Sequence, residues 1–536
     1  MRVERARTAR AARPGWARIG VDLIRSSSSA RACAQEAARA NRGRDGADHP
    51  ERDRGRPSLR GATARGGNVY PRGRSMSQSR STPGWWAAAG IGVVLLAARG
   101  GDPVAAHKRG ALRPNIVLIL ADDLGYGDLG CYGQKLTRTP SLDRLAAEGI
   151  RFTDFYAGST VCAPSRASLM TGQHQGHAYI RGNSRPGGDW RVQVPLRPRD
   201  LTVAEALKAA SYRTALIGKW GLGDAGTPGV PNHKGFDSFF GYLDQVHAHD
   251  YYPSFLWRDE EKVALPPGTY SSDLFTREAL AFLRQPQDQP FFLYLAYTTP
   301  HSNNAIPNGG GMQVPSDEPY TREPWPQPVK NRAAMITRMD RDIGEIVAAI
   351  DAQAGRDTVI FFSSDNGPAR EGGSDPAYFD SGGPLRGIKR DLYEGGIRVP
   401  FIARWKGRVR KGQVRRECLA LWDVFPTAAE LAGLAPPTGL DGISFVPTLL
   451  GLAQRPHDYL YWEFHERGFA RAVRQGRFKL LANGSGSPLE LYDLDTDVGE
   501  RDDLAALFPD RVRRLEAIMD KARVESAIWT VANPGP

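Results

Sequence analysis

The chain has 536 residues, with 71 Lys or Arg against 59 Asp or Glu, so its formal net charge is +12. In residues 1–75, 18 Arg outnumber 7 acidic residues by 11, and the rest of the chain is nearly neutral. Charge confined to a tail gives no support for nucleic-acid binding. The 41% apolar content excludes wholesale disorder, collagen and a polytopic membrane protein, and four cysteines are too few for a disulfide scaffold.

The first 106 residues divide into two parts of different character. Residues 1–75 are rich in Arg, Ala, Gly and Ser with few large apolar side chains, so a disordered extension is expected. Residues 76–106 have the order of a secretory signal peptide: a polar stretch with one Arg, an apolar run over 85–98 and a small-residue site at 104–106. This run is short for a membrane span, so we expect a secreted or periplasmic protein without stable membrane insertion.

The change of character at Met76 indicates that translation begins there and that residues 1–75 are a dispensable or untranslated extension. The alternative is a genuine disordered basic tail ahead of a membrane anchor. N-terminal sequencing of the exported protein distinguishes the two, because a start at Met1 would exclude the first interpretation.

From residue 113 the pattern alternates buried strands with amphipathic helices. Continuous apolar runs, typical of a parallel sheet covered on both faces, predict strands at 115–120, 214–218, 291–297 and 358–362. Helices are predicted from Thr139, over 202–210 and over 335–353. Thr139 is the expected N-cap of the first helix, with Pro140 at its first position. This alternation is typical of an α/β fold with a doubly wound sheet flanked by helices.

Polar residues follow each of the four predicted strands. They are Asp122 and Asp123, Lys219, His301, and Asp365 and Asn366. One polar strand end is ordinary, but four at the same edge of one sheet predict a ligand site. The carboxylate and amide oxygens among them suit a hard cation, Ca²⁺, or Mg²⁺ if the site is tighter. For Asp122 and Asp123 alone, a helix or turn cap is the competing interpretation.

After about residue 450 the pattern changes to short alternating strands. These are predicted at 459–464, 469–474, 477–482 and 490–492, and a helix follows over 508–524. We therefore expect a C-terminal α+β subdomain over 451–536, with a small antiparallel sheet and one helix packed on the main domain.

A cysteine lies in the stretch Val-Cys-Ala-Pro-Ser-Arg-Ala-Ser-Leu-Met-Thr-Gly, residues 161–172. A lone Cys near a Pro is usually a buried, inert thiol. Here Cys162 is expected one turn before a helix that starts near Pro164, where amide N–H groups and the helix dipole favour an anion. Arg166 would reach back to the same point. An activated thiolate fits this setting, but no His–Asn pattern around Cys162 supports a cysteine hydrolase.

This stretch resembles the signature of type I sulfatases, the formylglycine-dependent branch of the alkaline phosphatase superfamily. The resemblance covers about residues 113–505. Its further blocks are 115–126, 218–220, 299–301, 364–367, 385–389, 394–400, 490–495 and 500–504. It implies a large mixed sheet of the alkaline phosphatase kind, a catalytic domain over 111–450 and an arylsulfatase-like activity on sulfuric esters.

In that family the signature Cys is oxidised to formylglycine by a dedicated enzyme that reads Cys-x-Pro-x-Arg. By resemblance, Asp122, Asp123, Asp365 and Asn366 hold the cation, and Cys162, as hydrated formylglycine, contributes an oxygen to it and attacks sulfur. Arg166 would neutralise sulfate charge and activate the attacking hydroxyl. Lys219, Lys389 and His301 would bind sulfate oxygens, with His301 or Lys389 protonating the leaving oxygen.

The sequence departs from the family at one position. The family block is commonly Gly-Lys-Trp-His-Leu-Gly, and here Gly221 replaces the His that assists the elimination step. General acid–base groups contribute about 10²–10⁴-fold to a rate, so a substitute is expected. His247 and His249 lie where the family places further polar residues, and we expect His249 to be the substitute. The alternative is that both line a substrate pocket or are exposed.

We therefore expect a sulfatase that acts on a sulfate ester, on a carbohydrate rather than on a small aryl alcohol, and that meets a formylglycine-generating enzyme during maturation. One alternative is a phosphomonoester or phosphodiester hydrolase, because the superfamily's site serves both tetrahedral anions. Another is a catalytically silent protein that binds sulfated glycans, which only Gly221 supports. Four residues after the signature helix either face the substrate or are solvated: His174, His177, Arg181 and Asn183.

Overall fold

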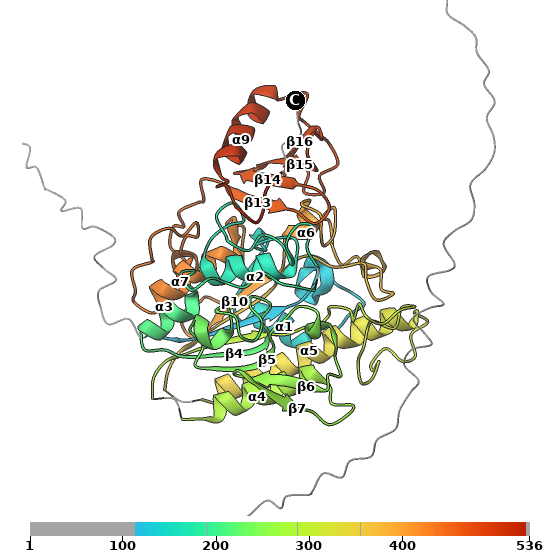
Figure 1. Ribbon diagram of the computed structural model, residues 1–536, viewed down its shortest axis with the longest axis vertical. Helices are drawn as coiled ribbons and strands as arrows, with labels where there is room; N and C mark the ends of the chain where they lie inside the picture. The colour runs from blue at the N-terminus through green and yellow to red at the C-terminus, as the bar shows by residue number, and fades with distance from the viewer. Residues whose placement is uncertain (1–112, 190, 287, 354, 532–536) are drawn as a thin grey trace, which may run out of the picture. The chain divides into compact units, whose positions relative to one another are not determined.

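The computed structural model describes residues 113–189, 191–286, 288–353 and 355–531 (Figure 1). The predicted extension, signal peptide and start at Met76 lie outside these residues. Nine α-helices are found in the described part of the chain: α1 (Pro140–Ala147), α2 (Cys162–Thr171), α3 (Val203–Ala209), α4 (Ser271–Arg284), α5 (Gln327–Asp351), α6 (Glu394–Ile397), α7 (Val424–Leu431), α8 (Val446–Leu449) and α9 (Pro509–Lys521). None of these described helices is long and apolar enough to cross a membrane.

The strands of the described residues form three sheets. The large sheet contains β1 (Asn115–Ala121), β2 (Ile150–Phe152), β4 (Arg213–Lys219), β5 (Ser238–Tyr242), β6 (Phe255–Arg258), β7 (Glu261–Ala264), β8 (Phe291–Ala296), β9 (Thr358–Ser364), β10 (Phe401–Trp405) and β11 (Gln413–Arg415). A two-stranded sheet pairs β3 (Phe155–Tyr156) with β12 (Leu419–Ala420). The C-terminal sheet contains β13 (Leu460–Phe464), β14 (Ala470–Gln475), β15 (Phe478–Ala482) and β16 (Leu489–Asp493).

The large sheet is mixed, as the family resemblance implies. Its order is β11-β2-β10-β9-β1-β8-β4-β5-β6-β7. The four central strands β9, β1, β8 and β4 are parallel, with Val117 of β1 opposite both Leu293 of β8 and Ile360 of β9. Strand β10 runs antiparallel beside β9, and β6 and β7 are antiparallel at the far end. These four central strands are the ones that the apolar runs predict.

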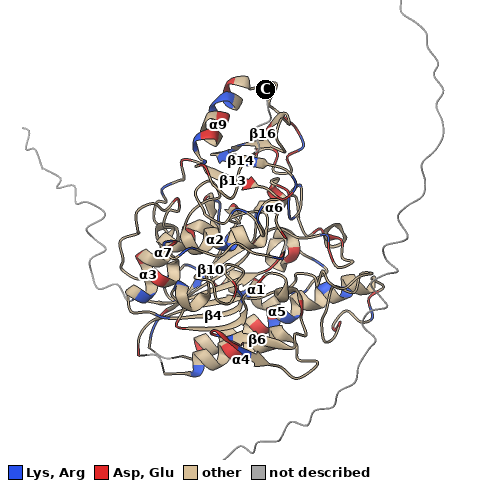
Figure 2. Cartoon of the chain, in the orientation of Figure 1, with Lys and Arg blue, Asp and Glu red and all other residues tan. Residues whose placement is uncertain are grey.

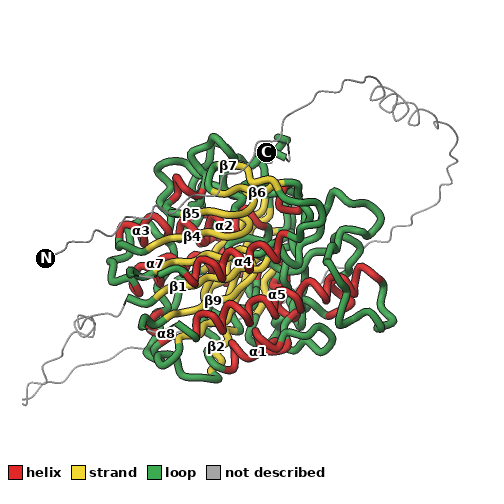
Figure 3. Tube along the Cα trace, turned by 90° about the horizontal axis from the view of Figure 1, so that it is seen from below, coloured by secondary structure: helices red, strands yellow, loops and turns green. Residues whose placement is uncertain are grey.

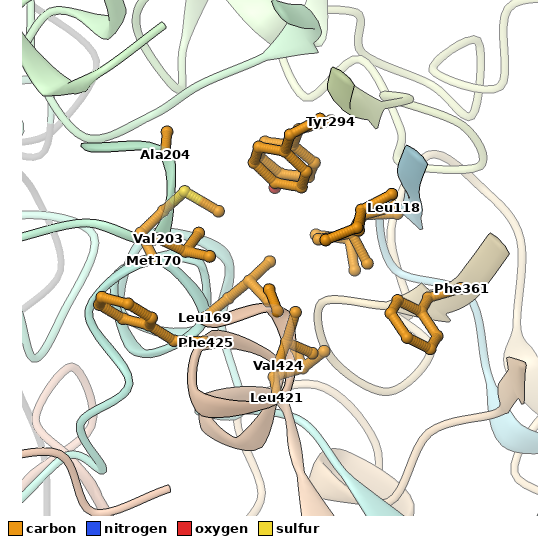
Figure 4. Close-up of a cluster of buried hydrophobic side chains, with 14 of the residues drawn as sticks. Leu118, Leu169, Met170, Val203, Ala204, Tyr294, Phe361, Leu421, Val424 and Phe425 are labelled. Carbon is orange, nitrogen blue, oxygen red and sulfur yellow. The ribbon is translucent and has the colours of Figure 1, made fainter. Parts of the chain in front are cut away.

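Helices cover both faces of the large sheet. Alternate side chains of a strand point to opposite faces, so each central strand contributes to two hydrophobic cores. Ile116, Leu118 and Leu120 of β1 pack with residues of α2, α3, α7 and α8. Figure 4 shows part of this core, where Leu118 lies among Tyr294, Phe361 and side chains from the helices. The intervening residues of β1 pack with α1, α4 and α5, which run across the sheet in Figure 3.

The C-terminal sheet has two apolar faces of its own. Tyr461, Val473 and Leu480 pack with Leu515 and Met519 of α9. The opposite face packs on the main body through Trp462 beside Tyr156 and Trp422. Figure 2 shows Lys, Arg, Asp and Glu interspersed along α9, which therefore buries one stripe only. The predicted small antiparallel sheet and its helix are both confirmed.

Two predicted helix starts are wrong. The helix expected from residue 335 begins at Gln327, because Pro328 suits its first turn and Val329 and Ala333 are buried against Tyr320 and Phe379. The signature helix begins at Cys162 itself rather than near Pro164, since a Pro within the first turn displaces no helical hydrogen bond.

Candidate active site

The carboxyl ends of β9, β1, β8 and β4 meet at one edge of the large sheet, and α2 begins at the same place. Every residue predicted at these strand ends is buried there, together with Lys389 and Cys162. Ligand atoms of Asp122, Asp123, Cys162 and His301 all lie within 4.8 Å of one another. Segments more than 200 residues apart are thus brought together by the parallel order of the four strands.

The three carboxylates are held by different cationic groups. Asp122 Oδ2 is 2.5 Å from Lys219 Nζ, and Asp123 Oδ2 is 2.8 Å from Lys389 Nζ. Asp365 Oδ2 accepts hydrogen bonds from Arg166 Nε at 3.0 Å and Nη2 at 2.8 Å. Burial raises the pKa of Asp122, but Lys219, His301 and Arg166 outweigh it and hold that pKa well below its usual range. Burial, aided by Asp122, raises the pKa of Asp365 to about 6.

The backbone at Asp123 is strained. Its φ is +64°, a conformation that non-glycine residues rarely adopt and that short polar side chains tolerate best. Its N–H donates to Asp365 Oδ1 at 3.2 Å, and its Oδ1 accepts from Asn366 Nδ2 at 2.7 Å. Strain of this kind persists where the surroundings fix the residue, as they do at functional sites.

The site contains a pair of stacked imidazoles. His301 Nδ1 is 2.7 Å from the Ser302 carbonyl oxygen, which only accepts, so Nδ1 carries the proton and Nε2 accepts from Lys389 Nζ at 3.0 Å. The ring of His249 stacks on His301 with centroids 4.4 Å apart. Burial lowers the pKa of both rings, that of His249 to about 2, so both are neutral.

The Cys162 thiol is fully buried at the first residue of α2, and its Sγ is 3.3 Å from Asp122 Oδ1. Burial and the neighbouring Asp122 raise the pKa of this thiol well above its usual value. The thiol is therefore protonated and a weak nucleophile in its unmodified form. The surroundings do not create the activated thiolate that the helix N-terminus alone would favour.

The donor set fits a hard divalent cation. Asp122 and Asp123 have carboxylate oxygens within 4.8 Å of each other, Asp365 Oδ1 accepts the Asp123 N–H, and Asn366 Nδ2 donates to Asp123 Oδ1. Carboxylate and amide oxygens of this kind are the usual ligands of Ca²⁺ and Mg²⁺. Asn366 Oδ1 is buried and accepts no hydrogen bond from any residue that the structure describes. Because buried polar atoms are nearly always paired, this orphaned oxygen indicates a missing partner.

Gly221 has φ +79°, and a Cβ placed there would lie 2.1 Å from Gln245 Nε2. The amide of Gln245 therefore fills the space into which a side chain at residue 221 would extend. Sequence reasoning missed Gln245, although it lies four residues before His249. His247 contacts Tyr242 and Phe255 instead, so the two histidines have different surroundings.

Sequence reasoning also missed Ser165 inside the signature. Its hydroxyl donates to the Asp365 carbonyl oxygen at 2.5 Å and accepts the Gly158 N–H at 3.0 Å, which joins α2 to the end of β9. Arg166 joins α2 to two strands: besides Asp365 at the end of β9, it donates to the Lys219 carbonyl oxygen of β4 at 2.9 Å. The side chains of Ser165 and Arg166 therefore fix the position of Asp365 relative to α2.

The four polar residues that follow the signature helix in the sequence do not share one location. His174 and His177 pair with Asp441, and Arg181 forms a buried ion pair with Glu463 at 3.0 Å. Only Asn183 reaches the start of α2, where its Oδ1 accepts the Ala163 N–H at 2.9 Å.

Comparisons with known proteins identify the family of the chain. The sulfatase family model matches residues 114–434, and the model of the N-sulphoglucosamine sulphohydrolase C-terminal region matches residues 387–521. Human arylsulfatase A is 34% identical over 485 residues, covering 77% of this chain and 89% of that protein. Human N-acetylgalactosamine-6-sulfatase is 34% identical, covering 65% and 68%.

Solved structures show the same fold. The structure titled Ps i-CgsB in complex with k-i-k-neocarrahexaose has a TM-score of 0.66 and 29% identity, covering 76% of this chain and 92% of that one. The sheet order, the site at its edge and these relatives lead to one conclusion. The chain belongs to the sulfatase family, whose members are sulfuric ester hydrolases.

Proposed function

We propose that this chain hydrolyses a sulfate ester on a carbohydrate, with Cys162 in its formylglycine form as the nucleophile and a divalent cation beside it. The observation that carries this proposal is the placement of Cys162. It is buried at the start of α2 with its Sγ next to the Asp122 carboxylate, at the same edge of the sheet as the Asn366 oxygen that accepts no hydrogen bond from the described residues. A thiol there is protonated, which leaves conversion of the side chain as the route to a nucleophile.

Asp122, Asp123, Asp365 and Asn366 would hold the cation, Ca²⁺ or Mg²⁺, which supplies charge neutralisation and lowers the pKa of a hydroxyl near it. Hydrated formylglycine offers two hydroxyl groups, one to attack sulfur and one whose oxygen becomes the aldehyde oxygen when sulfate leaves. This second role is closed to an unmodified Cys or Ser. A formylglycine-generating enzyme is therefore the partner required for maturation.

The chain's own cations receive the sulfate group. Lys219 and Lys389 are fully buried beside Cys162, so their charges act in a poorly solvated space where electrostatic stabilisation is strong. His301 Nε2 accepts from Lys389 Nζ and carries no proton of its own. The proton delivered to the leaving alcohol oxygen is thus assigned to Lys389, with His301 orienting it. Arg166 orients Asp365.

His249 is proposed as the base for the elimination step that the family His performs elsewhere. Its ring stacks on that of His301 at the site, and Gln245 occupies the space beside Gly221. Replacing His249 with Ala should slow sulfate release about 10²–10⁴-fold while release of the first alcohol persists as a burst. Rapid-quench kinetics on 4-nitrophenyl sulfate measures both phases. Equal steady-state rates in variant and wild type would exclude this role.

A carbohydrate substrate is supported by relatives whose names specify a sugar sulfate, such as N-acetylgalactosamine-6-sulfatase, and by the neocarrahexaose bound in a similar structure. An exported protein, secreted or periplasmic, is consistent with the pattern of residues 76–106.

The direct test uses protein produced together with a formylglycine-generating enzyme and supplied with Ca²⁺ or Mg²⁺. We expect inorganic sulfate to be released from sulfated sugars, with kcat/KM on a sulfate ester exceeding that on the matched phosphate ester. Preference for the phosphate ester would favour a phosphohydrolase. Binding of sulfated glycans without any turnover would favour a silent binding protein.

A further inference from the structure

A polar rim borders the candidate active site and is built from five residues of separate segments. It consists of Asn183, Asn304, Glu371, Arg390 and Glu466. Asn304 Nδ2 donates to Glu371 Oε2 at 2.8 Å, and Arg390 Nη1 donates to Glu371 Oε1 at 2.5 Å. Arg390 Nε lies 3.9 Å from Glu466 Oε2, and Glu466 Oε1 accepts the Asn183 N–H at 3.1 Å.

Both ends of the rim adjoin the residues proposed to bind sulfate. Asn183 holds the N–H of Ala163, next to Cys162, and Arg390 directly follows Lys389. Asn304 accepts a hydrogen bond from Ser302, the residue after His301. Glu371, in the middle of the rim, is also close to the residues proposed to bind sulfate. Burial raises its pKa, but the charges of Lys389, His301 and Arg390 outweigh burial and lower that pKa. A group bound at the rim is therefore the part of the substrate next to its sulfate.

Arg390 occupies a position that the backbone alone would give to glycine. Its φ is +78°, and its N–H is fixed by the Thr160 carbonyl oxygen at 3.1 Å and hydroxyl at 2.9 Å. A backbone strain of about 1–3 kcal/mol at a residue with a bulky side chain must be offset by other interactions. Here the strained conformation places the Arg390 guanidinium between the carboxylates of Glu371 and Glu466, and these ion pairs offset the strain. The side chain is only 24% exposed, so it is held in the rim and is not free in solvent.

The charges of the rim decide what it can recognise. Glu371 and Glu466 carry two negative charges and Arg390 one positive charge, so the rim is net negative although a sulfate ester is an anion. The guanidinium already faces two carboxylates and is a poor receptor for a second anion. Carboxylate oxygens can accept hydrogen bonds from hydroxyl groups, the remaining guanidinium N–H groups can donate to hydroxyl groups, and the two amides can do both. The side chains of Glu371, Arg390 and Glu466 are 17–24% exposed, which leaves them accessible to a ligand.

We infer that this rim binds the free hydroxyl groups of a monosulfated, otherwise uncharged sugar ring, and that it disfavours a second sulfate or a carboxylate on that ring. The inference rests on the proposed sulfatase function and narrows its substrate class. Glu466 and Glu371 accept hydroxyl hydrogens, and Arg390 holds the two carboxylates apart.

The test measures kcat/KM of the formylglycine-containing holoenzyme on 4-nitrophenyl sulfate, on galactose and N-acetylglucosamine monosulfates, and on the corresponding disulfates. Wild type should prefer the monosulfates. In Glu466→Gln, kcat/KM for the best monosulfate should fall about 10- to 100-fold relative to that for 4-nitrophenyl sulfate, because hydrogen bonds to a charged group are lost. The ratio of disulfate to monosulfate turnover should rise about tenfold at low ionic strength. Glu371→Gln should shift both ratios in the same directions.

Glu525→Gln is the matched control, since that side chain is 91% exposed, and both ratios should stay at the wild-type values. Wild-type preference for the disulfates, or unchanged ratios in both rim variants, would overturn the inference. Turnover of 4-nitrophenyl sulfate without turnover of any sugar would overturn it and leave sulfate-ester chemistry intact. Failure of wild type on every sulfate ester would instead overturn the proposed function, and the inference with it.

Discussion

Two buried clusters of charged side chains have the same numbers of acidic and cationic groups but different surroundings. Each contains three carboxylates and three cationic groups. The site cluster consists of Asp122, Asp123, Asp365, Arg166, Lys219 and Lys389. The junction cluster, where the C-terminal sheet meets the main body, consists of Asp154, Glu394, Glu500, Arg398, Arg474 and Lys479. Residues 387–400 link them, because this segment supplies Lys389 to one cluster and Glu394 to the other.

The junction cluster is closed by its own ion pairs. Lys479 Nζ lies 2.9 Å from Glu394 Oε1 and 2.8 Å from Glu500 Oε1, and Arg398 bridges Glu394 and Asp154 at 3.1 and 2.8 Å. Both clusters have a cysteine nearby, Cys162 at the site and Cys418 at the junction, and both have a buried oxygen that accepts no hydrogen bond from the described residues, Asn366 Oδ1 and Glu500 Oε1. The site cluster differs in its place in the fold, at the carboxyl ends of parallel strands and at the first residue of α2. Charge composition alone therefore does not identify a ligand site.

Removal of divalent cations should have the largest effect, and this effect should fall on the site cluster and not on the junction cluster. A chelator should lower turnover by about 10³-fold or more, because the proposed cation supplies several kcal/mol of stabilisation to the reaction. Added Ca²⁺ or Mg²⁺ should restore turnover, and the cation that does so at lower concentration identifies the native one. Full activity after exhaustive chelation would contradict the assignment of Asp122, Asp123, Asp365 and Asn366 as ligands.

Lys219 and Lys479, one fully buried lysine from each cluster, offer a matched pair of substitutions. Lys219→Met should lower kcat by about 10²–10³-fold, since it removes a charge that we propose binds sulfate. Lys479→Met should instead lower the free energy of unfolding by about 3–5 kcal/mol, because it leaves two buried carboxylates without their shared cation.

Kinetics corrected for the folded fraction, together with thermal unfolding, measure both outcomes. Turnover by folded Lys479→Met should stay within a few-fold of wild type. If Lys479→Met lost turnover at unchanged stability, the distinction between a catalytic and a structural cluster would fail.

The smallest effect concerns pH. Burial raises the pKa of Glu500 from 4.5 to about 7, so the folded state keeps a proton that the unfolded state has released, and stability is lost as pH rises from 4.5 through 7. Glu394 titrates below this window, since Lys479 and Arg398 overcome its burial and lower its pKa to about 2. Glu500→Gln should reduce the loss of stability between pH 4.5 and 7.5 by about 1–3 kcal/mol, measured by thermal unfolding. An unchanged pH profile would contradict this account of the junction.

The sequence predicts the central sheet and the residues at its edge because both signals are local. Apolar runs of strand length end in Asp122, Lys219 and Asp365, and parallel strands necessarily bring such ends together. The edge strand β7 is not predicted, since Glu261–Ala264 is largely exposed and its side chains do not alternate between buried and exposed.

Contacts between distant segments could not be predicted. The fit of Gln245 beside Gly221 depends on a positive φ and on how β4 and β5 end next to each other. The junction cluster joins Asp154, Glu394 and Lys479, which are separated by more than 80 residues each. Glu394 begins the family block 394–400, but nothing in the sequence around it points to Asp154 or Lys479. The placement of His249 near the site was predicted from the family resemblance, and its stacking on His301 is new.

Peptide mass spectrometry across Cys162 tests the central claim most directly. The protein should come from a host that contains a formylglycine-generating enzyme, with a Cys162→Ala variant as the reference peptide. We predict the mass of the aldehyde or its hydrate at residue 162. An intact thiol in protein isolated from its native host would contradict the account, because the buried, protonated Cys162 would then have no means of attacking sulfur.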